Sequence, residues 1–229
     1  MSVLYKLFPR DLVRKILAGK VSDGAFKEYL KLKVPGRRDE IINTAFIAVD
    51  FETTGLSPAK DNILSVGYTV IRDNRVVLKE SGYLLVRQEH NLHSENVAIH
   101  QITDTEAEQG VELQQALDEL LVKMSGKVLL AHHADIELGF LNAACLKYYG
   151  YHLPVRVVDT MLLEKNRLAR RHAGFKSGQL RLFNIRKAYG LPRYKAHNAL
   201  EDAVATAELF LAMLAKYCDD SKCRLNSFL

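Results

Sequence analysis

Apolar and polar positions in the first half of the chain follow the pattern of a β-sheet. Residues 44–50 form a short, nearly continuous apolar run, which is typical of a buried central strand. Residues 63–71 and 76–86 alternate between apolar and polar positions, as half-buried strands do. Because these two segments flank the polar residues 72–75, they predict a β-hairpin.

Helices and strands are expected to alternate further along the chain. Residues 111–124 have the spacing of an amphipathic helix, residues 128–131 that of a short buried strand, and residues 136–149 that of a second helix. Residues 155–158 predict another strand, and most of the remainder is helical in pattern. Three consecutive strands followed by alternating helices and strands predict an α/β domain with a mixed sheet.

The N-terminal region has a helical pattern of its own. Apolar residues recur at helical spacing over residues 3–18, where Pro9 is expected to interrupt the helix, and again over residues 26–32. Pro35-Gly36 and the charged residues after it predict a linker. The apolar stripe is expected to pack on the main domain. We therefore predict a helical N-terminal appendage and linker at residues 1–40, a main domain at 41–216 and a C-terminal tail at 217–229.

Composition narrows the class of protein. The chain of 229 residues is 48% hydrophobic and 26% charged, close to the average of globular domains. It has no apolar stretch near the roughly 20 residues that cross a bilayer, and its charged N-terminus lacks a cleavage site, so neither a membrane partner nor a signal peptide is expected. Three cysteines without a CxxC pair predict no disulfide scaffold or zinc site and favour a cytoplasmic location.

Positive charge is concentrated in one segment. Residues 165–195 contain ten Lys or Arg and no Asp or Glu, whereas the rest of the chain carries a net charge of −5. A basic segment on an acidic body is the arrangement expected of a protein that holds a polyanion at one place. The alternative is an ordinary solvated face rich in Lys and Arg.

Two carboxylates end the predicted central strand. Residues two apart on a strand point to the same face, so Asp50 and Glu52 project together. Paired carboxylates at the end of an apolar strand repel each other unless a cation or a proton compensates. Oxygen ligands at this spacing fit Mg²⁺ or Mn²⁺. The alternative is a strand end that simply runs into a polar turn.

The six residues Asp50-Phe-Glu-Thr-Thr-Gly55 resemble the first motif of the DEDD exonucleases, and in particular of the DnaQ-like branch. This branch includes the proofreading epsilon subunit of bacterial replicative polymerases. The resemblance implies a His and an Asp five residues apart near the C-terminus, and His197 and Asp202 supply them. Asn198 and Glu201 predict a helix start between the two, which lets His197 approach Asp202 from the preceding loop. The alternative is a His near a cap and an Asp favoured by the helix dipole.

The second motif of this family matches less closely. Family members carry a pattern like HNAxFDxxFL, and this chain has His132-His-Ala-Asp-Ile-Glu-Leu-Gly-Phe-Leu141. Aligning Phe140 places Glu137 at the position of the metal ligand. Asp135 lies about 200° away around a helix, so we expect it to cap the helix N-terminus instead. In the alternative, Glu137 is a surface residue and the metal site is degraded. His132 and the next histidine are expected to make local hydrogen bonds rather than bind metal.

The resemblance covers most of the chain and implies an RNase H-like fold, a five-stranded mixed sheet flanked by helices. It implies a 3′→5′ exonuclease that cleaves single-stranded DNA ends to nucleoside 5′-monophosphates by a two-metal mechanism, in repair or proofreading. Two Mg²⁺ or Mn²⁺ would be held by Asp50, Glu52, Glu137 and Asp202, and His197 would act as general base beside Asp50 and Glu52. Residues lining the nucleotide pocket would be Thr53, Thr54, Gly55, Leu56, His100, Ile102 and Phe140.

Three alternatives remain open at this point. No motif separates DNA from RNA, so the chain could be an exoribonuclease acting on RNA 3′ ends. Glu137 leaves room for a catalytically inert nucleic-acid-binding module. A third alternative is an accessory proofreading subunit with a DNA polymerase or replication partner.

Overall fold

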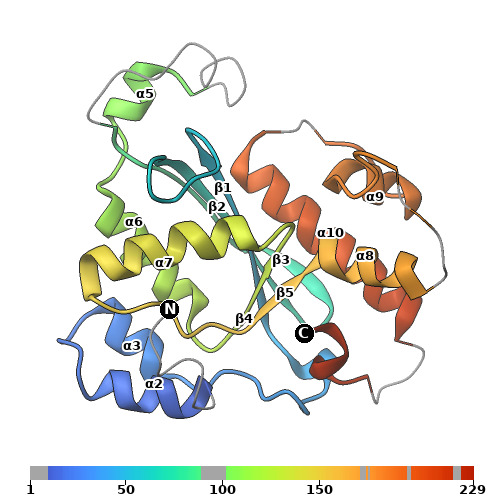
Figure 1. The fold of residues 1–229 in the computed structure, drawn as a ribbon, viewed down its shortest axis with the longest axis horizontal. Helices are drawn as coiled ribbons and strands as arrows, with labels where there is room; N and C mark the ends of the chain where they lie inside the picture. The colour runs from blue at the N-terminus through green and yellow to red at the C-terminus, as the bar shows by residue number, and fades with distance from the viewer. Residues whose placement is uncertain (1–9, 89–101, 171–173, 175, 195–196, 219–222) are drawn as a thin grey trace.

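A computed structural model describes residues 10–88, 102–170, 174, 176–194, 197–218 and 223–229 (Figure 1). The chain forms one five-stranded sheet with helices on both faces, as the sequence predicted. The strands, in chain order, are β1 (Phe46–Thr53), β2 (Ile63–Arg72), β3 (Arg75–Leu85), β4 (Val128–Ala131) and β5 (Val157–Asp159). Their spatial order is β3-β2-β1-β4-β5.

The sheet is mixed. β1 pairs antiparallel with β2, and β2 pairs antiparallel with β3. The predicted hairpin turn is present, with Asp73 and Asn74 both at positive φ, which is typical of a tight two-residue connection. β4 and β5 add to the other side of β1 in parallel, which requires crossover connections and brings the carboxyl ends of these strands to one edge.

Helices account for most of the remaining structure. They are α2 (Arg10–Ala18), α3 (Ala25–Lys31), η1 (Ile41–Asn43), α5 (Asp104–Glu108), α6 (Leu113–Met124), α7 (Asp135–Tyr149), α8 (Thr160–Arg170), α9 (Leu182–Ala188), α10 (Ala199–Tyr217) and η2 (Leu225–Phe228). None of the helices in these described stretches is long and apolar enough to span a bilayer.

The two faces of β1 bury different helices. Ile47, Val49 and Phe51 belong to a buried cluster that also contains residues of α6 and α7. Phe46 and Ala48 belong to a second cluster on the opposite face, together with residues of α10. Because side chains on a strand alternate, the even-numbered positions of β1 continue toward α10. This alternation aims the carboxylates at the strand end toward the start of α10.

The helices α2 and α3 share the core of the main domain. Val13, Leu17 and Phe26 are buried in the same cluster as residues of α6 and α7. Arg14 is also buried, and its guanidinium donates hydrogen bonds to the backbone carbonyls of Tyr29, Leu32 and Pro154. Pro9, where the interruption was expected, lies outside the described residues. The two helices therefore pack on the main domain. The domain boundaries at residues 40 and 216 stay a prediction.

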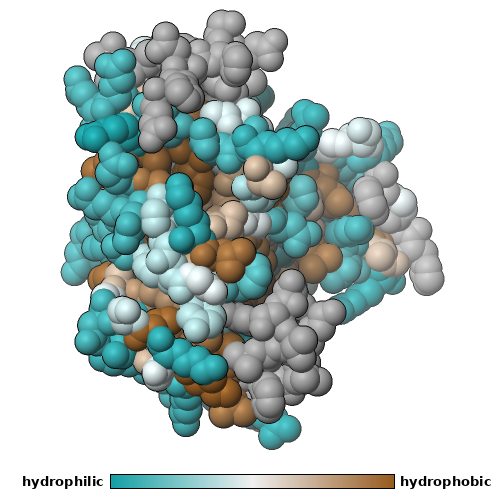
Figure 2. Space-filling view, turned by 60° about the vertical axis from the view of Figure 1, so that its left-hand side comes forward, coloured by the Kyte–Doolittle hydropathy of each residue, from teal (hydrophilic) through white to brown (hydrophobic). Residues whose placement is uncertain are grey.

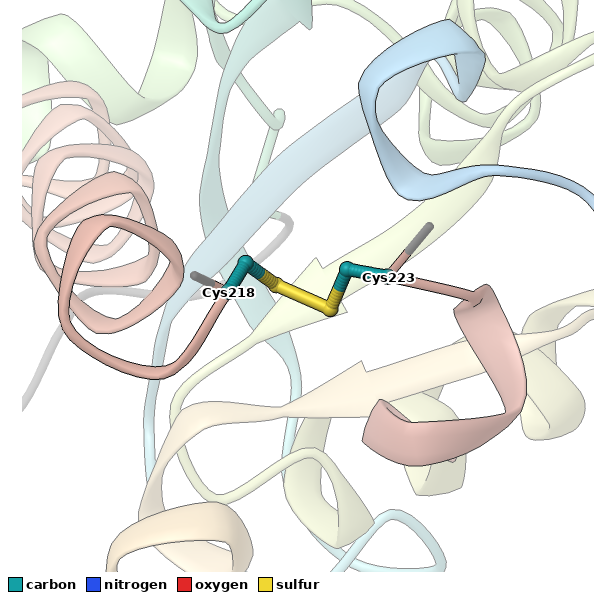
Figure 3. The surroundings of a disulfide bond; sticks show 2 residues. All are labelled: Cys218 and Cys223. Carbon is teal, nitrogen blue, oxygen red and sulfur yellow. A yellow bond between two sulfur atoms is a disulfide. The ribbon is translucent and has the colours of Figure 1, made fainter. Parts of the chain in front are cut away.

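A disulfide joins Cys218, directly after α10, to Cys223, which precedes η2 (Figure 3). The sequence predicted no disulfide scaffold. The structure corrects this prediction to one bridge between two cysteines that are five residues apart in the chain. Cys145 is a free, buried thiol in α7.

Hydrophilic and hydrophobic side chains are interspersed on the face of the molecule that Figure 2 shows.

Candidate active site

The first part of the site is the carboxyl end of β1. Asp50 pairs with Gly67 on β2, and Glu52 pairs with Ser65, so both carboxylates extend from the face that α10 covers. The register shifts between Glu52 and Thr53, a β-bulge that ends the regular pairing at this point. Bulges are common beside active sites because they turn the strand and redirect its side chains.

The second part of the site is the start of α10. Asn198 is the N-cap, and its side chain accepts hydrogen bonds from the backbone N–H groups of Leu200 and Glu201. His197 precedes the cap with a left-handed backbone (φ 69°), a conformation uncommon for a residue other than glycine. Its backbone N–H donates to Oδ2 of Asp202 at 3.1 Å. The predicted helix start is confirmed, and it places His197 beside Asp202.

Three carboxylates from these two elements converge. One oxygen each of Asp50, Glu52 and Asp202 lie within 4.8 Å of one another. Glu52 is buried, and the other two are partly exposed. Because like charges this close repel strongly, the cluster is unfavourable unless protons or cations neutralise it.

Glu137 approaches the same cluster from α7. It is only 4% exposed and lines the same pocket as the three carboxylates, although it is not among those within 4.8 Å of one another. Burial raises the pKa of Glu137 to about 8. Burial likewise raises the pKa of Asp202 to about 7, with the charge of Glu52 adding to the shift. The pKa of Asp50 lies well above its ordinary value, because of burial and then of repulsion from Glu137, Asp202 and Glu52.

The donor set fits divalent cations. Oε2 of Glu137 and Oδ1 of Asp202 are buried without a hydrogen-bond partner among the described residues. A buried carboxylate oxygen without a donor is costly unless a cation or proton satisfies it. Several hard oxygen ligands in one place are the set that Mg²⁺ and Mn²⁺ prefer. The four carboxylates therefore fit the predicted metal site.

Asp159, at the end of β5, holds two helix starts in place, and the sequence analysis missed it. Its carboxylate accepts hydrogen bonds from the backbone N–H groups of His133 and Ala134, which lead into α7. It also accepts from Met161 and Leu162 in the first turn of α8. Asp is a common N-cap, so the Asp-Thr that opens α8 was an available signal. The contacts to α7 depend on the fold and could not be predicted.

Two expectations for the start of α7 can be compared with the structure. Asp135 was expected to cap this helix, and this is wrong: the N-cap is Ala134 without a side-chain bond, because Asp159 already binds the backbone there. His132 was expected to make local hydrogen bonds, but its partners are distant in the chain. Its Nε2–H donates to the carbonyl of Leu180, and its Nδ1 accepts from the hydroxyl of Thr160. Burial lowers the pKa of His132 to about 4, so its ring is neutral.

A pocket of about 1100 Å³ opens over the carboxylates. Its lining includes Asp50, Glu52, Glu137, Asp202 and His197, and also Thr53, Thr54, Gly55 and Leu56. Leu56 is 74% exposed, an unusual state for a large apolar side chain. The hydroxyl of Thr53 donates to the carbonyl of Gly55, and that of Thr54 accepts from the backbone N–H of Asn62, so both hydroxyls shape the turn.

Two other predicted pocket residues do not line the pocket. Phe140 is buried in the core cluster that α6 and α7 form on one face of the sheet. Ile102 is buried in a small cluster with Leu64 and Ala107. The structure thus places both side chains in apolar clusters. His100 lies outside the described residues.

Basic residues, which we call the basic wall, also line the pocket. Lys176, Arg181 and Arg193 all line it, and all three come from the basic segment 165–195. Phe183, from the first turn of α9, lines the same pocket. Two other cations of the segment are used internally: Arg167 pairs with Glu164, and Arg186 pairs with Glu208. Cations and carboxylates therefore line the same pocket.

Residues 47–210, most of the chain, match the model of the family described as exonuclease (RNase T). The chain therefore belongs to the RNase T/DnaQ-like family of DEDDh 3′→5′ exonucleases, which are phosphodiester hydrolases. The resemblance seen in the sequence motifs is confirmed.

Two curated relatives are similar over about three quarters of this chain. A DNA polymerase III of the PolC type from Thermotoga petrophila is 29% identical over 169 residues, which are 74% of this chain and 12% of the relative. A 3′-5′ exonuclease DinG from Staphylococcus haemolyticus is 29% identical over 175 residues, 76% of this chain and 19% of the relative. The chain thus spans less than a fifth of either relative.

Solved structures show the same fold. The nuclease domain of 3′hExo, a DEDDh family member bound to rAMP, has a TM-score of 0.64 at 18% identity, covering 79% of this chain and 96% of that one. Exonuclease I of E. coli in complex with a 5cy-dT13 oligonucleotide has a TM-score of 0.64 at 17% identity, covering 77% of this chain and 42% of that one.

Proposed function

We propose that this protein is a metal-dependent 3′→5′ exonuclease that removes nucleotides from single-stranded DNA ends and releases nucleoside 5′-monophosphates. The observation that carries the proposal is the convergence of Asp50, Glu52 and Asp202 within 4.8 Å of one another, in a pocket that Glu137 and His197 also line. The pocket volume of about 1100 Å³ is ample for a nucleotide and its neighbour.

The four carboxylates would hold two Mg²⁺ or Mn²⁺. When bound, such ions promote deprotonation of the attacking water and stabilise the charge that develops on the leaving oxygen. His197 lines the pocket beside Asp202, where its imidazole can accept the proton of the attacking water. The released 3′-oxygen then takes up a proton from solvent.

The basic wall would hold the strand. Lys176, Arg181 and Arg193 line the same pocket as the carboxylates, so they can pair with phosphates of a strand bound there. Phe183 offers a ring on which a base can stack. Affinity is then expected to fall as salt concentration rises, because each phosphate contact releases a counterion.

DNA is the proposed substrate because the two curated relatives are a DNA polymerase and a 3′-5′ exonuclease, and one structural relative was solved with an oligonucleotide of deoxythymidine. On the same grounds, we propose a role in proofreading or repair, with a replication protein as partner. RNA is the alternative substrate, and the rAMP bound to a relative of the same fold supports it.

A time course with matched DNA and RNA oligonucleotides tests this proposal. Strands labelled at the 5′ end should shorten one nucleotide at a time in Mg²⁺ or Mn²⁺ and remain intact in chelator. DNA should be degraded faster than RNA of the same sequence. Faster loss of RNA would assign the enzyme to RNA ends, and binding without any shortening would contradict the exonuclease proposal in favour of an inert binding module.

A further inference from the structure

Arg186, on α9, is a fully buried cation at 0% exposure, although it belongs to the basic segment. Its Nη1 donates to the backbone carbonyl of Ala205 at 2.6 Å, and its Nη2 donates to the carbonyl of Pro192 at 2.9 Å. Nη2 also donates to Oε2 of Glu208 at 2.8 Å. Since solvent does not reach this side chain, it cannot contact a phosphate.

Tyr194 completes the arrangement. Its ring lies under the guanidinium of Arg186, 4.7 Å from ring centroid to Cζ, and its hydroxyl donates to Oε1 of Glu208 at 2.8 Å. A buried guanidinium is stable only when it is paired and hydrogen-bonded, and here a carboxylate, two carbonyls and an aromatic face surround it. The three side chains of Arg186, Tyr194 and Glu208 form one connected polar unit, which we call the arginine latch.

The arginine latch binds the chain on both sides of His197. Pro192 and Tyr194 lie five and three residues before it, in the loop that follows α9. Ala205 and Glu208 lie after it, in α10, the helix that carries Asp202. The latch therefore fixes the loop to the helix, and His197 is the residue at their junction, held in a left-handed backbone. A shift of the loop would move His197, which is exposed, relative to Asp202.

We infer that Arg186, with Tyr194 and Glu208, is a positioning residue for His197: it holds the loop after α9 against α10 and so keeps the imidazole beside Asp202. This inference rests on the proposed role of His197 as general base. No hydrogen bond joins the latch to the carboxylate cluster among the described residues, but the positive charge of Arg186 favours the ionised form of Asp202. Loss of the Tyr194 hydroxyl leaves this charge in place, so it should affect proton removal more than metal binding.

A double-mutant cycle with His197→Ala tests the latch. Arg186→Met removes all three hydrogen bonds, and Tyr194→Phe removes only the hydroxyl that binds Glu208, so it is the safer variant for folding. A general base contributes about 10²–10⁴-fold to kcat, so Arg186→Met is expected to lower kcat by about 10²-fold and Tyr194→Phe by about 5-fold. For Tyr194→Phe, which keeps the charge of Arg186 near Asp202, KM and the Mn²⁺ affinity measured by calorimetry should stay within about 2-fold of the wild type.

The decisive readout is non-additivity. In a His197→Ala background, either latch variant should lower kcat by less than about 2-fold, because the base that it positions is already absent. Arg14 and Tyr29 supply the matched control. Arg14 is a buried arginine that donates to backbone carbonyls and lies 4.3 Å over the ring of Tyr29, on the opposite face of the sheet. Arg14→Met and Tyr29→Phe should leave kcat unchanged even where they lower the melting temperature.

The outcomes separate this inference from the proposed function. Full activity of His197→Ala would contradict the proposed base, and the inference that rests on it. If His197→Ala lowers kcat as expected for a lost base but the latch variants lower kcat by the same factor in both backgrounds, the base assignment stands and the positioning role is overturned. Equal losses from Arg14→Met and Arg186→Met would also overturn it, because the effect would then be one of general stability.

Discussion

Gly67 on β2 and Ala199 at the start of α10 lie in direct backbone contact. A Cβ atom at Gly67 would be 2.0 Å from the carbonyl carbon of Ala199 and 2.2 Å from its oxygen. Gly67 also pairs with Asp50 across the sheet. The missing side chain therefore lets the first turn of α10 approach the strand that carries the carboxylates, and Asp202 reaches Asp50 and Glu52 for this reason.

Gly67→Ala is expected to abolish this approach. The new methyl group would meet backbone rather than a flexible side chain, so α10 must shift or the protein must lose about 3 kcal/mol or more of stability. Any Gly67→Ala protein that is recovered folded should bind Mn²⁺ at least about 10-fold more weakly than the wild type, because Asp202 is displaced from Asp50 and Glu52. Calorimetric titration with Mn²⁺ measures this. Wild-type affinity in Gly67→Ala would show that the contact does not set the geometry of the site.

Glu137 and Asp135 offer a matched pair of acidic residues two positions apart on α7. Glu137 is buried in the pocket, whereas Asp135 is exposed. Glu137→Gln is expected to lower kcat by about 10²-fold or more, because it removes a charged ligand of the proposed metal site. Asp135→Asn should leave kcat within about 2-fold of the wild type. The reverse result in oligonucleotide degradation would assign the ligand to Asp135.

The stability of the metal-free protein is expected to fall as pH rises. In the unfolded chain, Glu137 and Asp202 lose their protons near their ordinary values of 4.5 and 3.8, whereas in the folded protein burial raises these pKa values to about 8 and about 7. Between these limits the folded state binds more protons, so increasing pH favours unfolding. The free energy of unfolding should therefore decrease from about pH 4.5 to pH 8.

Denaturant unfolding in chelator at a series of pH values measures this dependence. Asp50→Asn removes one of the repelling carboxylates, so it should flatten the pH dependence and raise stability at pH 8 while it abolishes activity. Stability that is constant or increases between pH 5 and pH 8 would contradict the coupling of these groups.

Arg181 and Lys187 test the basic wall. Arg181 lines the pocket, and Lys187 is an exposed cation of α9 that is not among the lining residues. Arg181→Gln should reduce the slope of log affinity against log salt for single-stranded DNA by about 1, the value expected for one lost phosphate contact. Lys187→Gln should leave the slope unchanged. Fluorescence anisotropy measures the two slopes when both variants also carry Asp50→Asn, which prevents degradation of the DNA. Equal slopes for Arg181→Gln and Lys187→Gln would contradict the assignment of Arg181 to a phosphate contact.

Local sequence signals predicted the parts of the site that depend on neighbouring residues. The apolar run before Asp50 defined β1, and Asn198 defined the start of α10, because strand alternation and helix capping are properties of a few adjacent residues. These two elements carry Asp50, Glu52 and Asp202.

The remaining features depend on contacts between distant segments. In the sequence, Arg186 is one of ten cations in a basic segment. Only the fold shows that it is buried against Glu208 and Pro192. Gly67 lies within the predicted strand 63–71, and nothing in the sequence indicates that α10 packs directly on it. Such roles follow from tertiary packing, which composition and periodicity do not record.

Anomalous diffraction from crystals soaked in Mn²⁺ tests the central claim most directly. The carboxylates of Asp50, Glu52 and Asp202, with Glu137 beside them, are expected to surround two peaks about 4 Å apart. Crystals of Asp202→Asn should lose at least one of the two peaks. The absence of any peak among these side chains in the wild-type crystal, with manganese bound elsewhere or not at all, would contradict the account.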